Sequence, residues 1–286
     1  MKITTLIENT LGENKSLINE HGLSFFIETS EGNILFDTGQ SGDFIKNAKA
    51  LNIDLNKTDY LLLSHAHYDH CGGVKKYLDS VDIKPDLYIS KYFFDNSDKY
   101  HIFEDSKDEN ALKNGFTKYI GINFSKDYIM KKQVDINYIT GDFVKLTSKI
   151  SVHTNFKREC NFEYLNENLK MKINNTLLTD NFKDEIAISI TTEKGLLILV
   201  GCSHPGIVNI INTIQKRTGE KIYGVIGGTH LIEADNSRIE KTIQYFNKLN
   251  IKLIGVSHCT GENAINKFKN SCDNFFINCT GKIIVL

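Results

Sequence analysis

The stretch "LLLSHAHYDHCGG", residues 61–73, places three histidines and one aspartate within six consecutive positions, 65–70. The leucine run that opens it predicts a buried strand, and "VKKYL" after the two glycines predicts a helix. The polar cluster therefore lies at the carboxyl end of a strand, where the chain turns into a helix. Because open α/β folds bind their ligands at such turns, we expect a ligand site here.

Composition narrows the class of protein. The 286 residues are enough for one large domain. With 34 basic and 35 acidic residues, the chain has no general attraction to nucleic acid or to an anionic membrane. The opening "MKITTLIENT" contains no apolar signal segment, and nowhere do 18 apolar residues run together. We expect a cytoplasmic protein without nucleic-acid or membrane partners, whose six cysteines, Cys272 and Cys279 included, are reduced. Nothing in the sequence indicates an oligomeric state.

Alternation of apolar and polar residues predicts the order of elements. Residues 2–8 form a strand, 23–39 a hairpin that turns at Glu31-Gly32, and 184–204 a second hairpin, after which helices and strands alternate to the end. Residues 91–180 show little periodicity apart from strand-like pieces at 136–140 and 149–153. We expect this stretch to be an excursion that covers a site. The pattern predicts one α/β domain over residues 1–286, with two similar halves packed sheet against sheet and helices outside.

Four strand ends share one pattern, in which an apolar run passes through small residues to a histidine. They are "LLLSHAHYDH", "LILVGCSH", "YGVIGGTH" and "LIGVSHC". This brings together His65, His67, His70, His204, His230 and His258, with His21 near the first hairpin as a candidate for the pocket wall. Neutral imidazole with carboxylate suits zinc, iron, manganese or nickel. His65 and His67 face the same side of an extended segment, whereas Asp69 and His70 can face a second metal.

Several of these strand ends also begin helices. Small or capping residues stand at Cys71-Gly72-Gly73, Ser203-His204-Pro205-Gly206 and Cys259-Thr260-Gly261. Because helix N-termini bind anions, we expect phosphate or carboxylate beside the metals, near Gly72 or Gly206.

The motifs resemble those of a known superfamily. "SHAHYDHCGG" resembles the HxHxDH signature of the metallo-β-lactamase-fold superfamily, and "FDTG" resembles its first motif. Together with "GCSHPG", "GGTH" and "SHCTG", the chain resembles the branch of enzymes similar to 7,8-dihydropterin-6-yl-methyl-4-(β-D-ribofuranosyl)aminobenzene 5′-phosphate synthase. The resemblance spans residues 1–286 apart from the weak middle stretch. It implies a four-layer αβ/βα sandwich with a two-metal site between the sheets.

The resemblance also assigns roles to single residues. It implies that His65 and His67 bind one metal, that Asp69 and His70 bind the other, that His258 is the last histidine ligand and that Asp37 supports the site. Two positions depart from the superfamily pattern. Cys202 stands where a bridging aspartate is usual, and "DNFKDEI" at 180–186 lacks the usual histidine. We infer that His204 supplies the missing imidazole and that Cys202 is either a thiolate ligand or a neighbour of the metals.

Four further residues have two readings each. His230, which has no counterpart in the superfamily pattern, either faces substrate or supports a ligand, or is a satisfied structural histidine. In the first case it is a candidate catalytic residue together with Asp69, which would be both a ligand and a proton acceptor. Glu185 either supports the ligands or is a plain strand-edge carboxylate. Thr260 is a candidate for supporting the ligands or contacting substrate, and a role as a turn residue alone is the alternative for Asp37.

The resemblance implies a metal-dependent hydrolase or transferase that acts on an anionic, phosphate-bearing small molecule. Its cofactors would be two divalent ions, with zinc favoured over iron, manganese or nickel. In the synthase-like reaction the metals would polarise a diphosphate leaving group while an arylamine attacks the pterin methylene, whereas in hydrolysis they would activate water. The alternative from another class is a non-catalytic metal-dependent ligand-binding or sensor protein.

Overall fold

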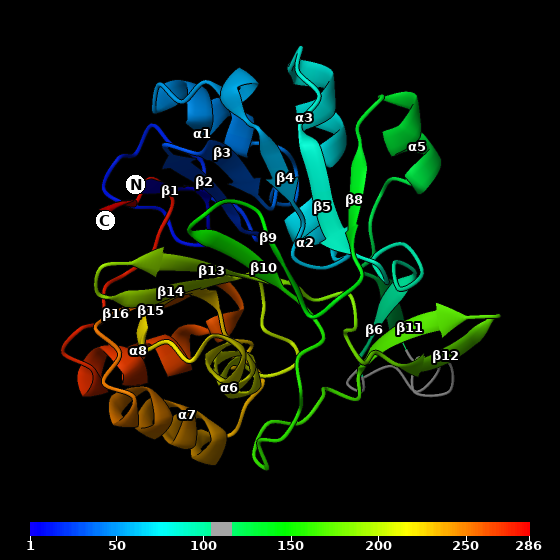
Figure 1. Cartoon of the computed structure of the whole chain (residues 1–286). Helices are drawn as coiled ribbons and strands as arrows, with labels where there is room; N and C mark the ends of the chain where they lie inside the picture. The colour runs from blue at the N-terminus through cyan, green and yellow to red at the C-terminus, as the bar shows by residue number, and fades with distance from the viewer. Residues whose placement is uncertain (104–115) are drawn as a thin grey trace.

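The computed structural model describes residues 1–103 and 116–286, and its main feature is a pair of sheets that face each other with helices on both outer sides (Figure 1). The first sheet has seven strands in the order β17-β1-β2-β3-β4-β5-β8. Their bounds are β17 Ile283–Val285, β1 Lys2–Ile7, β2 Ser24–Thr29, β3 Gly32–Phe36, β4 Tyr60–Leu62, β5 Asp86–Ser90 and β8 Ile136–Ile139. Its helices are α1 Phe44–Ala50, α2 Tyr68–Cys71, α3 Val74–Ser80 and α5 Lys126–Lys131, with a 3-10 turn at Leu55–Lys57.

The second sheet has six strands in the order β16-β15-β14-β13-β10-β9. Their bounds are β16 Leu253–Ser257, β15 Ile222–Gly228, β14 Gly195–Val200, β13 Ala187–Thr192, β10 Ile150–His153 and β9 Phe143–Lys145. Strands β14, β15 and β16 run parallel and are apolar almost throughout, as expected of strands buried on both faces. Three amphipathic helices cover the outer face, α6 Ile207–Thr218, α7 Asn236–Lys248 and α8 Glu262–Ser271, and a 3-10 turn at His258–Thr260 follows β16.

Three buried apolar layers hold the sandwich together. One lies between the sheets and includes Phe25, Phe36, Ile188 and Leu199, all fully buried. The other two lie between each sheet and its helices. The structure therefore confirms the four-layer αβ/βα sandwich that the sequence predicts. Both predicted hairpins are present, the first turning between Thr29 and Gly32 and the second between Thr192 and Gly195.

The stretch 91–180 divides between three sheets. Strands β8, β9 and β10 extend the two main sheets, whereas β6 Lys99–Phe103, β7 Phe116–Tyr119, β11 Leu169–Ile173 and β12 Thr176–Thr179 form a small sheet of their own beside the sandwich (Figure 1). Residues 104–115 of this stretch lie outside the described residues.

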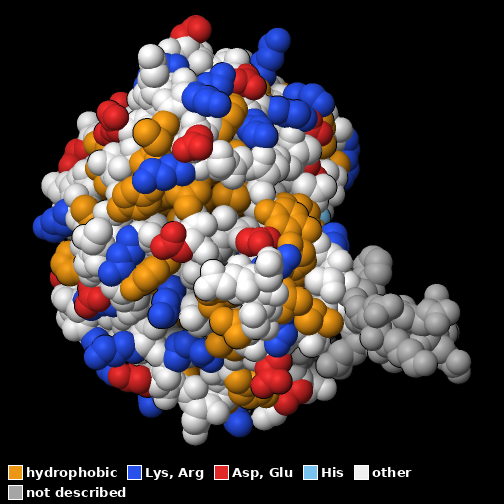
Figure 2. All heavy atoms as spheres, turned by 90° about the vertical axis from the view of Figure 1, so that its right-hand side faces the viewer, with side chains coloured by type: hydrophobic (Ala, Val, Ile, Leu, Met, Phe, Trp, Pro, Cys, Tyr) orange, Lys and Arg blue, Asp and Glu red, His pale blue; other side chains and the backbone are white. Residues whose placement is uncertain are grey.

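Two expectations about the whole chain can be compared with the structure. All six cysteines are described and none is disulfide-bonded, in agreement with reduced thiols. Over residues 1–103 and 116–286, no helix combines the length and the apolar character needed to span a bilayer. On the face in Figure 2, lysine and arginine side chains are interspersed with acidic ones and with apolar patches. The expectation of a small-molecule partner, without nucleic acid, stays a prediction.

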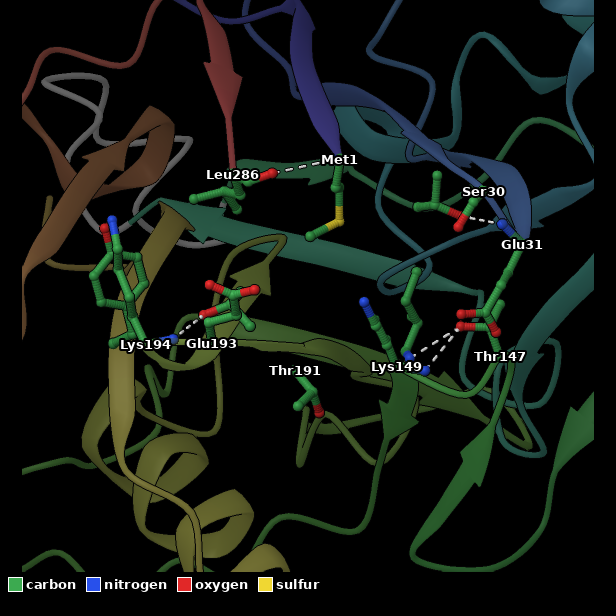
Figure 3. A pocket seen from close by; sticks show the side chains of 13 residues that line it. Met1, Ser30, Glu31, Thr147, Lys149, Thr191, Glu193, Lys194 and Leu286 are labelled. Carbon is green, nitrogen blue, oxygen red and sulfur yellow. Dashed lines mark hydrogen bonds between the residues drawn. The ribbon is translucent and has the colours of Figure 1, made fainter.

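A hollow of about 370 Å³ opens at the end of the sandwich where the two hairpins turn. Its lining includes the β2–β3 turn at Glu31, the β13–β14 turn at Glu193 and Lys194, and both chain termini (Figure 3). The amino group of Met1 donates a hydrogen bond to the carbonyl of Leu286 at 3.1 Å. No histidine or cysteine lines this hollow.

Candidate metal centre

At the opposite end of the sandwich, the loops after β4, β14, β15 and β16 meet. They bring together all six histidines of the four strand-end motifs, and each is buried or half-buried. Only glycine allows the closest approach, because a Cβ at Gly201 would lie 2.3 Å from Ser64 Oγ. The end of β14 can therefore pack against the start of the His65 loop.

The first group of donors consists of three imidazoles. His65 Nε2 lies 3.0 Å from His67 Nδ1 and 3.2 Å from His204 Nε2. Burial, with neighbouring positive groups, holds the pKa of all three well below the usual value, so the rings are neutral. Neutral imidazole is the form that binds metal ions. His204 thus lies beside His65 and His67 in this group, and its role as the superfamily's missing imidazole stays a prediction.

The second group is more acidic. Asp69 Oδ2 lies 3.2 Å from His258 Nε2 and 3.8 Å from His70 Nε2, and the two Nε2 atoms are 3.2 Å apart. The two groups lie side by side, because the ring centroids of His65 in the first and His70 in the second are 4.4 Å apart. Although burial opposes ionisation of Asp69, the surrounding imidazoles of His70, His21 and His258 lower its pKa well below the usual value.

Cys202 lies between the two groups. Its Sγ is 3.1 Å from His70 Nε2. Among the described residues, three sets of donor atoms lie within 4.8 Å of one another, and Cys202 belongs to each. The sets are Asp69, His70, Cys202 and His258; His65, Cys202 and His204; and Cys202, His230 and Cys259. The thiol therefore occupies a position from which a sulfur could contact either group.

Asp37, at a left-handed φ of 61° after β3, orients two of the imidazoles. Its Oδ2 lies 2.6 Å from His70 Nδ1 and accepts a hydrogen bond from Ser64 Oγ at 2.7 Å. Because a carboxylate only accepts, Nδ1 of His70 carries a proton, and Nε2 is the nitrogen that faces His258 and Cys202. Ser64 Oγ in turn lies 2.9 Å from His65 Nδ1, which leaves His65 Nε2 as the free nitrogen. The sequence analysis missed Ser64, whose only signal is its position just before the motif.

Asn9 orients the imidazole of His258 in the same way. Its Oδ1 lies 2.8 Å from His258 Nδ1, so that Nε2 faces Asp69. Its Nδ2 is 3.3 Å from His21 Nδ1, and His21 Nε2 is 3.2 Å from Asp69 Oδ2. With its side chain 49% exposed, His21 lies at the solvent edge of the site, as expected of a pocket wall.

Glu185 and Thr260 form hydrogen bonds to the backbone of the loops that carry the histidines. Glu185 accepts hydrogen bonds from the backbone N–H groups of Ser203 at 2.9 Å and His204 at 3.4 Å. Burial, with Asp184 nearby, raises the pKa of Glu185 to about 8. Thr260 Oγ1 accepts from the backbone N–H of Thr229, which joins the end of β15 to the turn after β16. Both side chains are buried. They can therefore hold in place the loops that carry His204 and His258, and they are not placed to contact a substrate.

His230 lies against His204, with ring centroids 4.2 Å apart, and its φ of 47° is unusual for this residue type. Among the described residues, neither of its ring nitrogens has a hydrogen-bond partner. Both histidines line a cavity of about 410 Å³ that Phe182, Glu233, Arg238 and the segment Tyr164–Asn168 complete, and His230 Nε2 lies 3.7 Å from Glu233 Oε2. Arg238 is 8% exposed, and its Nε also lacks a partner.

The two helix starts do not offer the anion sites expected from the sequence. At α6, the carboxylate of Glu163 accepts the N–H groups of Val208 at 2.9 Å and Asn209 at 2.8 Å. At Gly72, a Cβ would lie 2.0 Å from the carbonyl oxygen of Gln40, so the backbone is packed there. The prediction of a ligand anion at Gly72 or Gly206 is therefore wrong, because an internal carboxylate and the chain itself fill these places.

The donor set fits transition-metal ions. Several buried nitrogens point at one another at 3.0–3.2 Å, and the buried atoms His67 Nε2 and His204 Nδ1 have no hydrogen-bond partner. Burying polar atoms without partners is costly unless a ligand satisfies them. Nitrogen, oxygen and thiol donors in one cluster suit zinc or iron rather than magnesium or calcium.

Comparisons with known proteins agree with this arrangement. A profile of the metallo-beta-lactamase superfamily matches residues 18–136. The 7,8-dihydropterin-6-methyl-4-(beta-D-ribofuranosyl)-aminobenzene-5′-phosphate synthase of Methanocaldococcus jannaschii is 34% identical over 99% of this chain and 96% of its own. An uncharacterized protein of the same organism is 31% identical over 99% of each chain.

A crystal structure of a metal-dependent hydrolase of the β-lactamase superfamily superposes with a TM-score of 0.83, at 26% identity over 100% of this chain and 99% of its own. The fold alone is shared with a metallo-β-lactamase-fold protein of Bacillus subtilis, at a TM-score of 0.56 and 11% identity over 99% of this chain and 98% of its own. The chain belongs to the metallo-β-lactamase superfamily, in the branch that resembles the dihydropterin–ribofuranosylaminobenzene phosphate synthase.

Proposed function

We propose that the chain is a metal-dependent enzyme that acts on an anionic, phosphate-bearing small molecule at a two-metal site, with zinc as the favoured ion. The observation that carries this proposal is the convergence of His65, His67, His204, Asp69, His70, His258 and Cys202 from separate loops into one buried cluster. A structural role alone does not account for the buried His67 Nε2 and His204 Nδ1, which have no hydrogen-bond partner among the described residues.

The residues divide between two ions. His65, His67 and His204 would hold one, and Asp69, His70 and His258 the other, with Cys202 within reach of both. Divalent ions held there would supply Lewis-acid polarisation of a phosphoryl oxygen and would lower the pKa of water toward ~7. Asp37, Ser64 and Asn9 set the ring tautomers before any ligand arrives.

The cavity beside His204 is where substrate would lie. His230 lines this cavity without a hydrogen bond to either ring nitrogen among the described residues, and its Nε2 lies 3.7 Å from Glu233 Oε2. The guanidinium of Arg238 provides a fixed positive charge. Arg238 is held by its ring contact with Tyr164 and by the carbonyl of that residue at 3.4 Å. A guanidinium suits phosphate because its donors match phosphoryl oxygens in a fixed fork.

The reaction is either hydrolysis or group transfer. The name of the archaeal relative describes a product that carries a 5′-phosphate, and this supports a phosphate-bearing substrate here. A non-catalytic sensor would use the same pocket to hold such a molecule unchanged. Turnover therefore separates the two classes.

The test is a screen of the zinc-loaded protein with phosphate monoesters, phosphate diesters and pterin diphosphates, the latter with and without an arylamine. We expect turnover of at least one class, which Arg238→Met weakens by raising KM about tenfold or more while metal content stays unchanged. The matched control is Lys248→Met, an exposed lysine on the same helix. Tight binding of a phosphate compound without turnover would instead favour the sensor.

A further inference from the structure

Lys99, the first residue of β6, is a lysine without solvent exposure. Its Nζ lies 2.9 Å from Asp180 Oδ2 and 3.0 Å from Asp184 Oδ1, and neither aspartate is exposed. Burial alone would lower the pKa of Lys99, but the two carboxylates raise it above the ordinary value, so the ammonium stays charged. The result is a buried cation between two buried anions, in the part of the chain with the weakest sequence signals.

One of these aspartates holds the first metal-binding loop. Asp184 Oδ2 accepts a hydrogen bond at 2.8 Å from the backbone N–H of Ala66, the residue between His65 and His67. Two residues further on, the N–H of Ile186 donates to the carbonyl of Ser64 at 2.8 Å. The segment 184–186 is therefore hydrogen-bonded to the backbone of the loop that carries His65 and His67.

A second contact reaches His204. The Phe182 ring stacks on the His204 ring with centroids 3.9 Å apart and planes within 7°, and it meets His67 edge-on at 5.7 Å. Lys99 Nζ lies 4.6 Å from the centroid of the Phe182 ring. Phe182 has a left-handed φ of 50°, which a bulky residue adopts only where its surroundings impose it. Two imidazoles of the first donor group, those of His67 and His204, thus contact Phe182, and Asp184 holds the backbone next to His65.

Stability alone does not explain this arrangement. Replacing a buried ion pair with apolar side chains is often neutral or stabilising, so such a triad is weak evidence for a purely structural role. Its contacts instead end on ligand histidines and on the backbone between them. Removing a group that orients a metal ligand commonly lowers metal affinity by about 10–100-fold.

We propose that Lys99 is a positioning residue, which acts through Asp184 and Phe182 to hold His65, His67 and His204 in the geometry that binds one of the two metal ions. The inference rests on the proposed function, because it requires these histidines to bind metal. It also gives the small sheet a role in the site, since Lys99 pairs with Met171 of β11, beside the segment that lines the cavity.

The test titrates the metal-free protein with Co²⁺ against a chelator and follows the visible absorption of the bound ion. Lys99→Met should weaken one of two binding steps by about 10–100-fold and change its spectrum, while the other step stays as in the unmodified protein. Phe182→Leu should weaken the same step by a smaller factor, because both ion pairs of Lys99 remain. Lys216→Met, which removes an exposed lysine paired with Glu159, is the matched control.

The outcomes separate the two proposals. If the unmodified protein binds no Co²⁺, the proposed function fails. If it binds two ions and Lys99→Met and Phe182→Leu bind both as tightly, the positioning role is overturned and the proposed function stands. Should Lys99→Met not fold, Phe182→Leu decides the matter, since it leaves every buried charge paired.

Discussion

The two ends of the sandwich both contain a hollow, yet they differ in how their polar groups are satisfied. At the hairpin end, Glu31 accepts from Ser148 N and Oγ at 2.7 Å each, and no residue that lines the hollow has a buried polar atom without a partner. At the histidine end, ring nitrogens of His67, His204 and His230 are without partners. A hollow alone therefore does not identify a site. Buried polar groups that need a ligand do.

The largest expected effect breaks the metal cluster itself. His65→Ala should remove the ion bound by the first group and lower activity by more than about a hundredfold. Removing a group that only orients a ligand already costs about 10–100-fold in metal affinity or activity, and His65 is itself a proposed ligand. Metal analysis and initial rates measure both quantities. At the other end of the sandwich, Lys149→Ala should keep metal content unchanged and activity within about twofold. Equal losses in both variants would remove the distinction between the two ends.

A second pair of variants sharpens the comparison within the histidine end. His204→Ala should lower metal occupancy at one position, with affinity reduced tens-fold or more, because its Nε2 faces His65 Nε2. His230→Ala should keep both ions and impair substrate handling, since its ring faces the cavity. Metal content and kinetic constants of both variants are the measurement. Full metal loading in His204→Ala with loss in His230→Ala would show that the two roles are exchanged.

Asp37→Asn tests whether orientation of the imidazoles matters. The amide can donate as well as accept, so it no longer forces the proton of His70 onto Nδ1. We expect metal affinity to fall about 10–100-fold with little change in the overall fold. Chelator competition measures the affinity, and circular dichroism checks the fold. Unchanged affinity would reduce Asp37 to a turn residue.

The smallest effect concerns a buried histidine outside the cluster. His153 Nε2 lies 2.8 Å from Ser189 Oγ, and burial, with Arg217 nearby, lowers its pKa to about 4. The unfolded chain therefore binds a proton near pH 6.5 that the folded chain rejects. The stability that comes from the neutral ring is full above pH 6.5 and is lost as the pH falls toward 4.

In His153→Gln, the free energy of unfolding should fall by about 2 kcal/mol less between pH 7 and pH 5 than in the unmodified protein. Urea unfolding at the two pH values measures this difference. Metal content should be unchanged, because burial alone does not make a histidine a ligand. A parallel pH dependence in both proteins would exclude His153 as its source.

Local patterns were enough to predict much of the fold and the donor residues. Apolar runs that end in small residues and a histidine mark the ends of β4, β14, β15 and β16. Because the carboxyl ends of parallel strands lie at one edge of a sheet, these local patterns were enough to place the histidines together. Pairing across the chain was not visible in the same way. Asp184 meets Ala66 across 118 positions, and Glu163 fills the α6 helix start from 45 positions away. Neither contact has a local signature, because Asp184 and Glu163 both lie in loops outside the regular elements and far along the chain from the groups that they bind.

The central claim is that the histidine end holds two metal ions. The most direct measurement is a crystal structure of gently purified, zinc-supplemented protein, with anomalous diffraction at the zinc edge and metal analysis of the same sample. We expect two zinc peaks per chain, one at His65, His67 and His204 and one at Asp69, His70 and His258, with Cys202 beside both. No metal in the sample, or peaks only at other residues, would contradict it.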